Sequence, residues 1–350
     1  MARTACITYR VAHLALSEAW TGRAGERQAN DLMGVTSAAT THSQEEPGLI
    51  GVDWGTSSCR AYLMGRDGGV LTSVSTDKGI MQVEDGAFAE TLAALIGNWR
   101  RPGLPVILSG MIGSRQGWIE APYVTVPASF DAIAKALVRH PDDADIYIAP
   151  GLAQDLPGQA PDVMRGEETQ IIGAVGDISD RQLLVMPGTH SKWVLVEDRK
   201  IVWFVTFMTG ELFAVLKHHS ILGRLMAAGD EDRSAFEQGL DAAGTLPGGL
   251  LQHLFSARTL ALFDRLPEGA VAPYLSGLLI GHEIADALGN LETTSDLPPI
   301  TVIGASALAK RYVDALGHAE FDARQAGEDR AAFGQSQLAH AAKLFSPATG

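Results

Sequence analysis

Residues 49–76 and 183–207 follow one pattern, and this internal repeat constrains the fold more than any other feature of the sequence. Each stretch reads as an apolar strand, a tight turn with Gly-Thr, a second strand, another turn and a third strand. Because a duplicated segment signals a duplicated structural unit, the repeat predicts two related α/β lobes, each opening with a three-stranded antiparallel ribbon. A shift of 133 residues aligns identical residues: Val52 with Val185, Gly55 with Gly188, Thr56 with Thr189, Ser58 with Ser191, and Arg66 with Arg199.

The rest of the chain supports two lobes. A chain of 350 residues is longer than one ordinary domain. We therefore expect an N-terminal lobe over residues 49–180 and a C-terminal lobe over residues 181–350. Apolar periodicity predicts helices over 88–99, 273–288 and 306–316, a helix that begins at 211, and strands over 106–109, 146–149 and 301–303.

Residues 1–48 differ from the rest. From residue 28 onward they are rich in Ser, Thr, Ala, Gln and Glu without apolar periodicity, which is typical of a flexible extension. The Arg residues before that point suggest an organelle-targeting peptide, but Glu18 and Glu26 argue against one. We expect a dispensable extension, with Met33 as an alternative start.

Charge and cysteine content exclude several classes of protein. The net charge is -14, from 27 basic and 41 acidic residues, and no Lys/Arg cluster offers a nucleic-acid surface. No stretch approaches the ~20 consecutive apolar residues of a membrane helix. The two cysteines, Cys6 and Cys59, form no metal or redox motif, which favours a reducing cytoplasm. The oligomeric state stays open, with a homodimer as one candidate.

The two Gly-Thr turns suit a bound nucleotide. Turn amides can point at phosphate groups from opposite sides of a cleft, and glycine lets the backbone approach closely. The alternative is a pair of ordinary hairpin turns. The candidate phosphate-binding residues are Gly55, Thr56, Ser57 and Ser58 in the first turn and Gly188, Thr189, His190 and Ser191 in the second.

A later break between strand and helix suits an adenine ring. Gly304, Ala305 and Ser306 follow an apolar strand and open a helix, so a flat ring could lie against small residues there. The same junction is common in α/β proteins of any function.

An acidic residue distinguishes the first turn from the second. Asp53 ends the first strand, whereas the equivalent residue in the repeat is Met186. A single carboxylate in the cleft suits Mg²⁺, which takes few protein carboxylates and keeps several waters. The alternative is an aspartate that caps its own turn.

These motifs resemble the two phosphate motifs and the adenosine motif of the actin–hexokinase ATPase superfamily, whose lobes are ribonuclease H-like. Six longer segments carry a narrower resemblance: IGVDWGTSSCRAYL, SGMIGSRQGWIEAPYVTVPA, VMRGEETQIIGA, VMPGTHSKW, FMTGELFAVLKHHSILG and SGLLIGHE. With them, the chain from about residue 49 to about residue 344 resembles the 2-dehydro-3-deoxygalactonokinase family. The resemblance implies MgATP-dependent phosphorylation of 2-dehydro-3-deoxy-D-galactonate on O6, in galactonate catabolism and in the cytosol.

Sugar kinases of this superfamily place an acidic base one helix ahead of the second phosphate motif. The resemblance therefore implies that Glu167 or Glu168 accepts the proton of the attacking hydroxyl. Spacing does not distinguish them, and the other glutamate could stabilise the first turn of the helix. A third, less favoured alternative gives part of this work to Asp53.

A sugar acid needs a cation or amides for its carboxylate. Arg165 could pair with that carboxylate, or instead with Glu167 or Glu168. Trp118 could be a binding platform or part of the core. The remaining substrate candidates lie in the loop after the strand at 106–109, and they are Ser109, Met111, Gly113, Ser114 and Arg115.

His190 and Lys192 could each reach a phosphate group. Lys192 is the better candidate because it is charged at neutral pH, although strand alternation could turn it to solvent. The neighbouring His218 and His219 diverge on a helix and make a poor metal site.

Three alternatives to this kinase stay open. One is a kinase for the gluconate epimer of the same keto-deoxy acid, since only pocket geometry reads one hydroxyl. The second is a non-sugar ATPase of the same superfamily, and the third is a phosphatase that positions water.

Overall fold

The computed structural model describes residues 46–345, except 177, 179, 228–231, 292–296, 305 and 328. Of the predicted extension, residues 1–48, only the last three fall within the described part, and strand β1 begins at Pro47. The predicted α/β class is confirmed by two six-stranded sheets, one three-stranded sheet and the helices around them.

The first six-stranded sheet has the order β3-β2-β1-β4-β8-β7. Strands β1, β2 and β3 form an antiparallel ribbon, and β4 and β8 continue from β1 in parallel. Strand β1 is buried from Gly48 to Val52 and β4 along its whole length, because both lie inside the sheet, whereas the edge strand β3 has no buried residue. The strands are β1 (Pro47–Trp54), β2 (Cys59–Gly65), β3 (Val70–Thr76), β4 (Val106–Ser109), β7 (Val138–Arg139) and β8 (Ile146–Ile148).

The second six-stranded sheet has the order β15-β14-β11-β12-β13-β6 and repeats five strands of the first. Strands β11, β12 and β13 are antiparallel, and β14 and β15 continue from β11 in parallel. Five strands of each sheet therefore share one order and one set of directions. The strands are β6 (Ala128–Ser129), β11 (Gln182–Met186), β12 (Ser191–Glu197), β13 (Lys200–Phe207), β14 (Ile300–Val302) and β15 (Ala323–Gln325).

The constant shift of 133 residues relates β1 to β11 but fails in both turns of the ribbon. Across the first turn Asp53 pairs with Arg60, whereas Met186 pairs with Lys192, one residue short of the shift. The first ribbon turns through residues 66–69, whereas the second turns in two residues, Asp198 and Arg199, whose φ values are 48° and 56°. Two residues with positive φ match the twist of a tight hairpin. The alignment of Arg66 with Arg199 is therefore not a structural equivalence.

A three-stranded sheet and the helices complete the fold. The small sheet has the order β10-β9-β5, with β5 at Tyr123–Thr125, β9 at Gly151–Gln154 and β10 at Asp162–Met164. None of the described helices is long and apolar enough to cross a bilayer. The described helices are α2 (Phe88–Ile96), α3 (Phe130–Lys135), α4 (Glu167–Val175), α5 (Thr209–His219), α6 (Arg233–Thr245), α7 (Leu250–Leu262), α8 (Val271–Gly289), α9 (Ser306–His318) and α10 (Arg330–Ala341).

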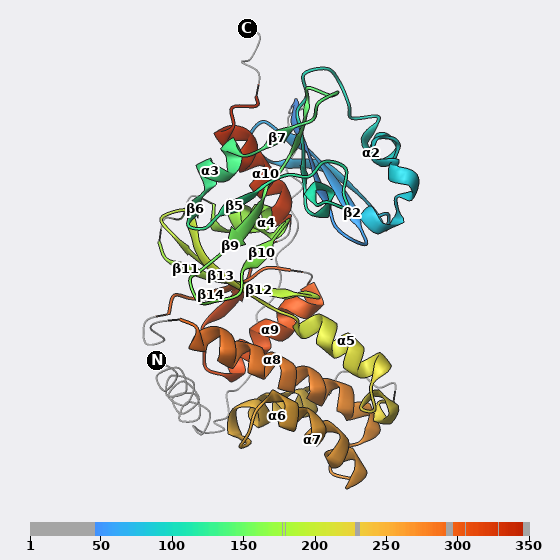
Figure 1. Ribbon diagram of the computed structural model, residues 1–350, viewed down its shortest axis with the longest axis vertical. Coiled ribbons are helices and arrows are strands. Elements are labelled where there is room, and N and C mark those ends of the chain that lie inside the picture. The colour runs from blue at the N-terminus through green and yellow to red at the C-terminus, as the bar shows by residue number, and fades with distance from the viewer. Residues whose placement is uncertain are drawn as a thin grey trace, which may run out of the picture.

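Helices α4 and α10 join the two large sheets. Helix α4 packs on β11 of the second sheet, and α10 packs on β1, β2 and β4 of the first. They cross at Gly173 and Gly334, where a Cβ on either glycine would collide with the backbone of the other helix. Figure 1 shows α10 in the upper part of the molecule, level with α2, and α4 just below it, with α6 to α8 at the lower end. The crossing holds the beginning of α4 between the two sheets.

Candidate active site

A cleft of about 730 Å³ opens where β1 and β11 end, and both Gly-Thr turns face it. A second hollow of about 450 Å³ continues from it. The two share Asp53, Arg60, Tyr62, Gln170, Ile303 and Gly304. The structure therefore brings the two repeated turns to one space. The main cleft is lined by Asp53, Gly55, Thr56, Ser58, Cys59, Arg60, Tyr62, Ser75, Thr76, Asp77, Gly110, Met111, Arg165, Gly166, Glu167, Gln170, Met186, Pro187, Gly188, Thr189, His190, Ile303 and Gly304.

The first turn is supported from behind and exposed in front. The Gly55 N–H donates to the Ser58 carbonyl over 2.9 Å, which closes the turn. A Cβ on Gly79 would collide with the backbone of Thr56 and Ser57, so this glycine allows the supporting segment to approach. Residues 56–58 are exposed. The turn is thus a fixed polar surface at the end of β1.

The second turn lies against the beginning of α5. The Glu211 N–H donates to the Thr189 carbonyl over 2.9 Å, and a Cβ on Gly210 would collide with the Gly188 carbonyl. His190 Nε2 lies 2.5 Å from a Glu211 carboxylate oxygen, and that pair is about half-exposed. The partial positive charge of a helix N-terminus therefore lies beside this turn, which favours an anion there.

Asp53 lies at the end of β1, beside Ser109 of β4, and its carboxylate lines both hollows. Burial and the nearby Glu167 raise the pKa of Asp53 to about 6, and Arg60 opposes them. Gly110 has a φ of 93°, and a Cβ there would lie 2.7 Å from the Trp54 carbonyl oxygen and 3.3 Å from Asp53 Oδ1. A glycine is therefore needed at this close approach.

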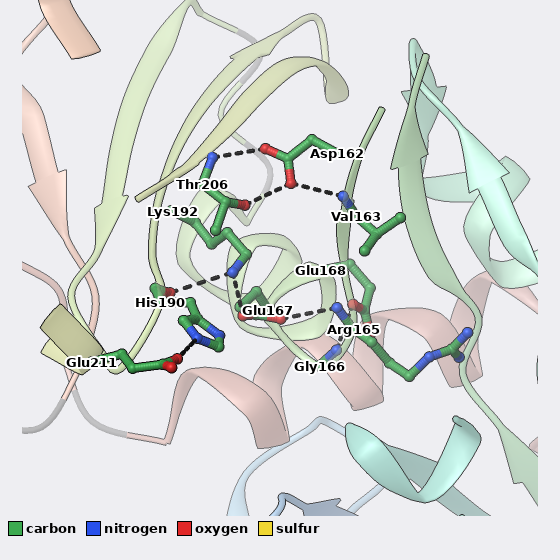
Figure 2. Close-up of polar contacts among 10 residues, drawn as sticks. All are labelled: Asp162, Val163, Arg165, Gly166, Glu167, Glu168, His190, Lys192, Thr206 and Glu211. Atoms are coloured by element: carbon green, nitrogen blue, oxygen red, sulfur yellow. Dashed lines mark hydrogen bonds and ion pairs between the residues drawn. The ribbon is translucent and has the colours of Figure 1, made fainter. Parts of the chain in front are cut away.

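Glu167 is the first residue of α4 and lines the cleft. Its Oε2 accepts a hydrogen bond from the Arg165 N–H over 3.0 Å, and its Oε1 lies 3.4 Å from Lys192 Nζ. Figure 2 shows this carboxylate between Lys192 and the Arg165 backbone. Gly166, with a φ of 103°, lets the segment before α4 pass within van der Waals contact of Gly110. Glu167 and Asp53 thus face one cleft.

Lys192 is 4% exposed, so the expectation that strand alternation could turn it to solvent is wrong. Strand β12 lies inside the second sheet and its first four residues are buried, because both faces of the sheet are covered there. Lys192 Nζ also donates to the His190 carbonyl over 3.3 Å. The ammonium group ties Glu167 to the second turn.

Glu168 is completely buried and does not line the cleft. Its Oε2 accepts a hydrogen bond from the Gly166 N–H over 2.7 Å, and its Oε1 is buried without a partner among the described residues. Burial, followed by the charge of Glu167, raises the pKa of Glu168 to about 8. The two neighbouring glutamates therefore have different environments, and Glu167 is the one that a ligand can reach.

The Glu168→Gln variant should become more stable than the wild type as the pH rises. Because the pKa of Glu168 is raised from 4.5 to about 8, the folded protein keeps a proton that the unfolded chain releases. The contribution of Glu168 to the free energy of unfolding is fully present below the pKa that Glu168 has in the unfolded chain. It is lost as the pH rises through the pKa of Glu168 in the folded protein. Glutamine keeps an acceptor for Gly166 and cannot ionise. Thermal denaturation should show a difference in Tm that widens from about pH 5 to about pH 9, and a constant difference would contradict this.

Arg165 lines the cleft, but its guanidinium lies under the loop that follows β4. Its Nη2 donates to the Ala121 carbonyl over 2.8 Å, and its Cζ lies 4.4 Å from the Tyr123 ring centroid. Its Nε and Nη1 are buried without partners, and Figure 2 shows the side chain extending away from Glu167 and Lys192. Within the described part of the chain, the alternative ion pair with Glu167 or Glu168 does not form.

Of the other substrate candidates, only some line the cleft. Met111 reaches the cleft, together with Gly110, whereas Ser109, Gly113, Ser114 and Arg115 are not among its lining residues. The Ser109 hydroxyl accepts from Gln335 Nε2 over 2.8 Å inside the core. Gly113 is buried, and a Cβ there would lie 2.9 Å from Arg165 Nη1.

The remaining two loop candidates and Trp118 have structural contacts instead. The Ser114 hydroxyl donates to the Met111 carbonyl over 2.7 Å and so closes its own turn. Arg115 is 88% exposed at its side chain and pairs with Glu120 over 3.0 Å. Trp118 packs against the core of the first sheet, with its ring centroid 4.6 Å from that of His140. Four of the predicted substrate residues, Ser109, Gly113, Ser114 and Arg115, therefore do not line the cleft.

Gly304 reaches the cleft with a φ of 151°, at the end of β14. Ala305 and the side chain of Ser306 lie outside the described residues. Arg60 and Tyr62 also line the cleft, and the sequence interpretation missed them. Arg60 and Tyr62 are two residues apart near the start of β2, so their side chains lie on the same face of the sheet. This spacing was the signal that could have identified them. His218 and His219 are exposed on α5, and the described residues contain no cluster of metal-ligating side chains.

Comparison with known proteins places these residues in a family context. A family model for 2-keto-3-deoxy-galactonokinase matches residues 53–338, a range that contains the whole cleft. The 2-dehydro-3-deoxygalactonokinase of Escherichia coli strain K12 is 36% identical over 293 residues, which cover 83% of this chain and 97% of that protein. A probable 2-dehydro-3-deoxygalactonokinase of Rhizobium meliloti strain 1021 is 37% identical over 302 residues, covering 85% and 97% respectively. A crystal structure described as a 2-dehydro-3-deoxygalactonokinase protein from Sinorhizobium meliloti has a TM-score of 0.77 and 36% identity, covering 84% of this chain and 98% of that one.

Proposed function

The chain belongs to the 2-keto-3-deoxy-galactonokinase family, and from that premise we propose that it transfers a phosphoryl group from ATP to O6 of 2-dehydro-3-deoxy-D-galactonate. The family resemblance seen in the sequence motifs is confirmed, and the chain is a sugar-acid kinase. The proposed substrate rests on the match of residues 53–338 to the family model, because that range includes every residue that lines the cleft. The product is 2-dehydro-3-deoxy-6-phospho-D-galactonate, and the proposed compartment is the cytoplasm.

The proposed architecture is a pair of duplicated ribonuclease H-like lobes that close over the nucleotide and the sugar acid. Two observations support this architecture. The two large sheets share one order of five strands, and α4, which precedes β11 in sequence, packs on the second sheet, whereas α10, near the end of the chain, packs on the first. In this arrangement the turns after β1 and β11 hold phosphate groups from opposite sides. Gly304, which lines the cleft, would lie beside the adenosine.

Asp53 is the residue we assign to Mg²⁺. A half-buried carboxylate that lines the cleft, whose pKa is raised to about 6 and which lies near a second carboxylate, Glu167, is a site that gains from a cation. Oxygen ligands in small number fit Mg²⁺, which completes its shell with water and substrate phosphates. When bound, the ion neutralises the charge of the phosphate groups. The described donors therefore fit this cofactor.

Glu167 is the residue we assign to the proton of the attacking hydroxyl. It lies in the cleft on the first turn of α4, close enough to Asp53 to raise the pKa of that group. Lys192 and the Arg165 N–H hold its carboxylate in place. A base must reach the hydroxyl that it deprotonates, and Glu168 is enclosed.

Arg165 is the residue we assign to the substrate carboxylate. Two nitrogens of its buried guanidinium lack hydrogen-bond partners, which is unfavourable, and no ion pair of Arg165 forms among the described residues. The carboxylate of a sugar acid would supply both the charge and the acceptors. A neutral sugar would leave this cation uncompensated, so the proposal favours an acid.

Replacing Arg165 with lysine should raise the KM for the sugar acid by about tenfold or more and leave the KM for ATP unchanged. Lysine keeps the charge but loses the planar fork that binds a carboxylate through two hydrogen bonds. Steady-state kinetics with each substrate varied will measure this. The matched control is Arg115→Lys, because Arg115 lies in the neighbouring loop and points to solvent. An equal rise in both KM values would argue against carboxylate recognition.

The function itself is tested by ADP release from MgATP with a panel of keto-deoxy sugar acids. Release that rises steeply with 2-dehydro-3-deoxygalactonate supports the proposal. A steeper rise with the gluconate epimer would assign the other substrate. ADP release that is equal without any sugar acid would indicate a non-sugar ATPase and overturn the proposal.

A further inference from the structure

A buried carboxylate lies behind the second phosphate turn and outside the cleft. Glu283, in the middle of α8, is 2% exposed and is not among the residues that line the cleft. No cation pairs with it anywhere in the described ranges. Burial raises the pKa of Glu283, and hydrogen bonds from Thr209, Tyr312, Trp193 and Ser191 oppose that rise. A buried charge that is held by neutral donors alone calls for an explanation.

Its hydrogen bonds join three other elements of the second half. Trp193 Nε1 on β12 donates to Glu283 Oε1 over 2.9 Å, and the Tyr312 hydroxyl on α9 donates to Glu283 Oε2 over 2.7 Å. The Tyr312 oxygen also lies 3.0 Å from the Ser191 hydroxyl. With the tyrosine proton on Glu283, the single proton of the Ser191 hydroxyl can go either to the Tyr312 oxygen or to Glu283. Thr209, the first residue of α5, completes the set.

Each of these elements also touches the proposed nucleotide site. Ser191 follows directly after the second turn, and Thr209 precedes Gly210, which packs on the backbone of that turn. Tyr312 belongs to the helix that begins after Gly304. A small hollow of about 70 Å³ lies among the same elements, between the second turn, α5, α8 and α9.

We propose that Glu283 is a positioning residue that holds the second phosphate turn, the beginning of α5 and α9 in the arrangement that binds ATP. This inference rests on the proposed function, because it assumes that the second turn binds phosphate groups. The carboxylate acts through Ser191, Thr209 and Tyr312 and does not touch the nucleotide.

A carboxylate suits this role better than an amide. Trp193 and Tyr312 both donate, so the centre of the network must accept on both of its oxygens. In Glu283→Gln one of these acceptors becomes an NH₂ group. If the amide oxygen stays with Trp193, the tyrosine hydroxyl must turn to accept from the NH₂ group, which changes its bond with Ser191. The substitution therefore disturbs the support of the second turn without emptying the site.

The experiment measures the Kd of a non-hydrolysable ATP analogue with Mg²⁺ by calorimetry, together with both KM values and the Tm. Glu283→Gln and Tyr312→Phe should each raise the Kd and the KM for ATP by about tenfold, the size expected for one lost hydrogen bond to a charged group. The KM for the sugar acid should not change. The control is Tyr274→Phe, which removes another buried hydroxyl, one bonded to Ser256 on α7 and remote from the second turn.

The outcomes are distinct. If both variants lose thermal stability as Tyr274→Phe does but bind the analogue like the wild type, Glu283 serves only stability and the inference is overturned. If Glu283→Gln does not fold, Tyr312→Phe decides by the same criterion. A wild-type protein that binds the analogue but phosphorylates no sugar acid would refute the proposed function and would leave the comparison of nucleotide affinities intact.

Discussion

The Asp53→Asn variant should lose about 10²- to 10³-fold in kcat, the range found when one preorganised electrostatic group is removed from a reacting centre. Asp53 is the acidic residue at the end of β1, and the equivalent residue in the second sheet is Met186. Asparagine keeps the size of the side chain and one oxygen, but it removes the negative charge that would hold Mg²⁺. The KM for the sugar acid should stay within a few-fold of the wild type, because Arg165 and Met111 are untouched.

Kinetics over a range of Mg²⁺ concentrations will test this prediction. The control is Asp77→Asn, since Asp77 also lines the cleft but is exposed at the end of β3. A near-normal kcat in Asp53→Asn would remove the metal role from this residue. A loss of similar size in Asp77→Asn would show that the rate responds to the general charge of the cleft and not to one carboxylate.

The decline of kcat/KM at low pH should also depend on Asp53. The pKa of Asp53 is raised to about 6 by burial and by Glu167, so a falling pH protonates this group earlier than an ordinary aspartate. The ionised form is needed for a cation, and kcat/KM should therefore decline as the pH falls through about 6 in the free enzyme. Saturating Mg²⁺ should move this decline to lower pH, because a bound cation favours the carboxylate.

The second large effect should separate two adjacent residues. We expect Glu167→Gln to lose about 10²-fold or more in kcat, as is usual when a general base is removed, whereas Glu168→Gln should stay within a few-fold. Glu167 lines the cleft, and Glu168 is enclosed with one oxygen on the Gly166 N–H. Glutamine can still accept from the Arg165 N–H in the first variant, so the loss should come from the missing base.

Calorimetry with the ATP analogue controls for indirect effects, because Glu167 also contacts Lys192. The nucleotide affinity of Glu167→Gln should change little compared with its kcat. Equal losses of kcat in both variants would indicate that α4 as a whole has moved. If both variants kept a kcat close to that of the wild type, the base would have to be another residue of the cleft.

Local patterns predicted much of the fold. The repeat of strand, Gly-Thr turn and strand predicted both antiparallel ribbons, and β4 and the long helix α8 lie where apolar spacing placed them. These elements depend on side-chain periodicity and turn chemistry within about ten residues, which a sequence displays directly. The repeat did not predict that one hairpin turn has four residues and the other has two, because strands can pair across turns of different length.

The sequence alone also determined the family, and with it the candidate chemistry, through motifs that surround the cleft. Only the tertiary structure decided which candidates meet there. The crossing of α4 and α10 at Gly173 and Gly334 sets the rotation of α4, and that rotation turns Glu167 to the cleft and Glu168 to the core. Adjacent helical residues point about 100° apart, so a packing partner more than 150 positions away along the chain decides which of the two glutamates faces the cleft.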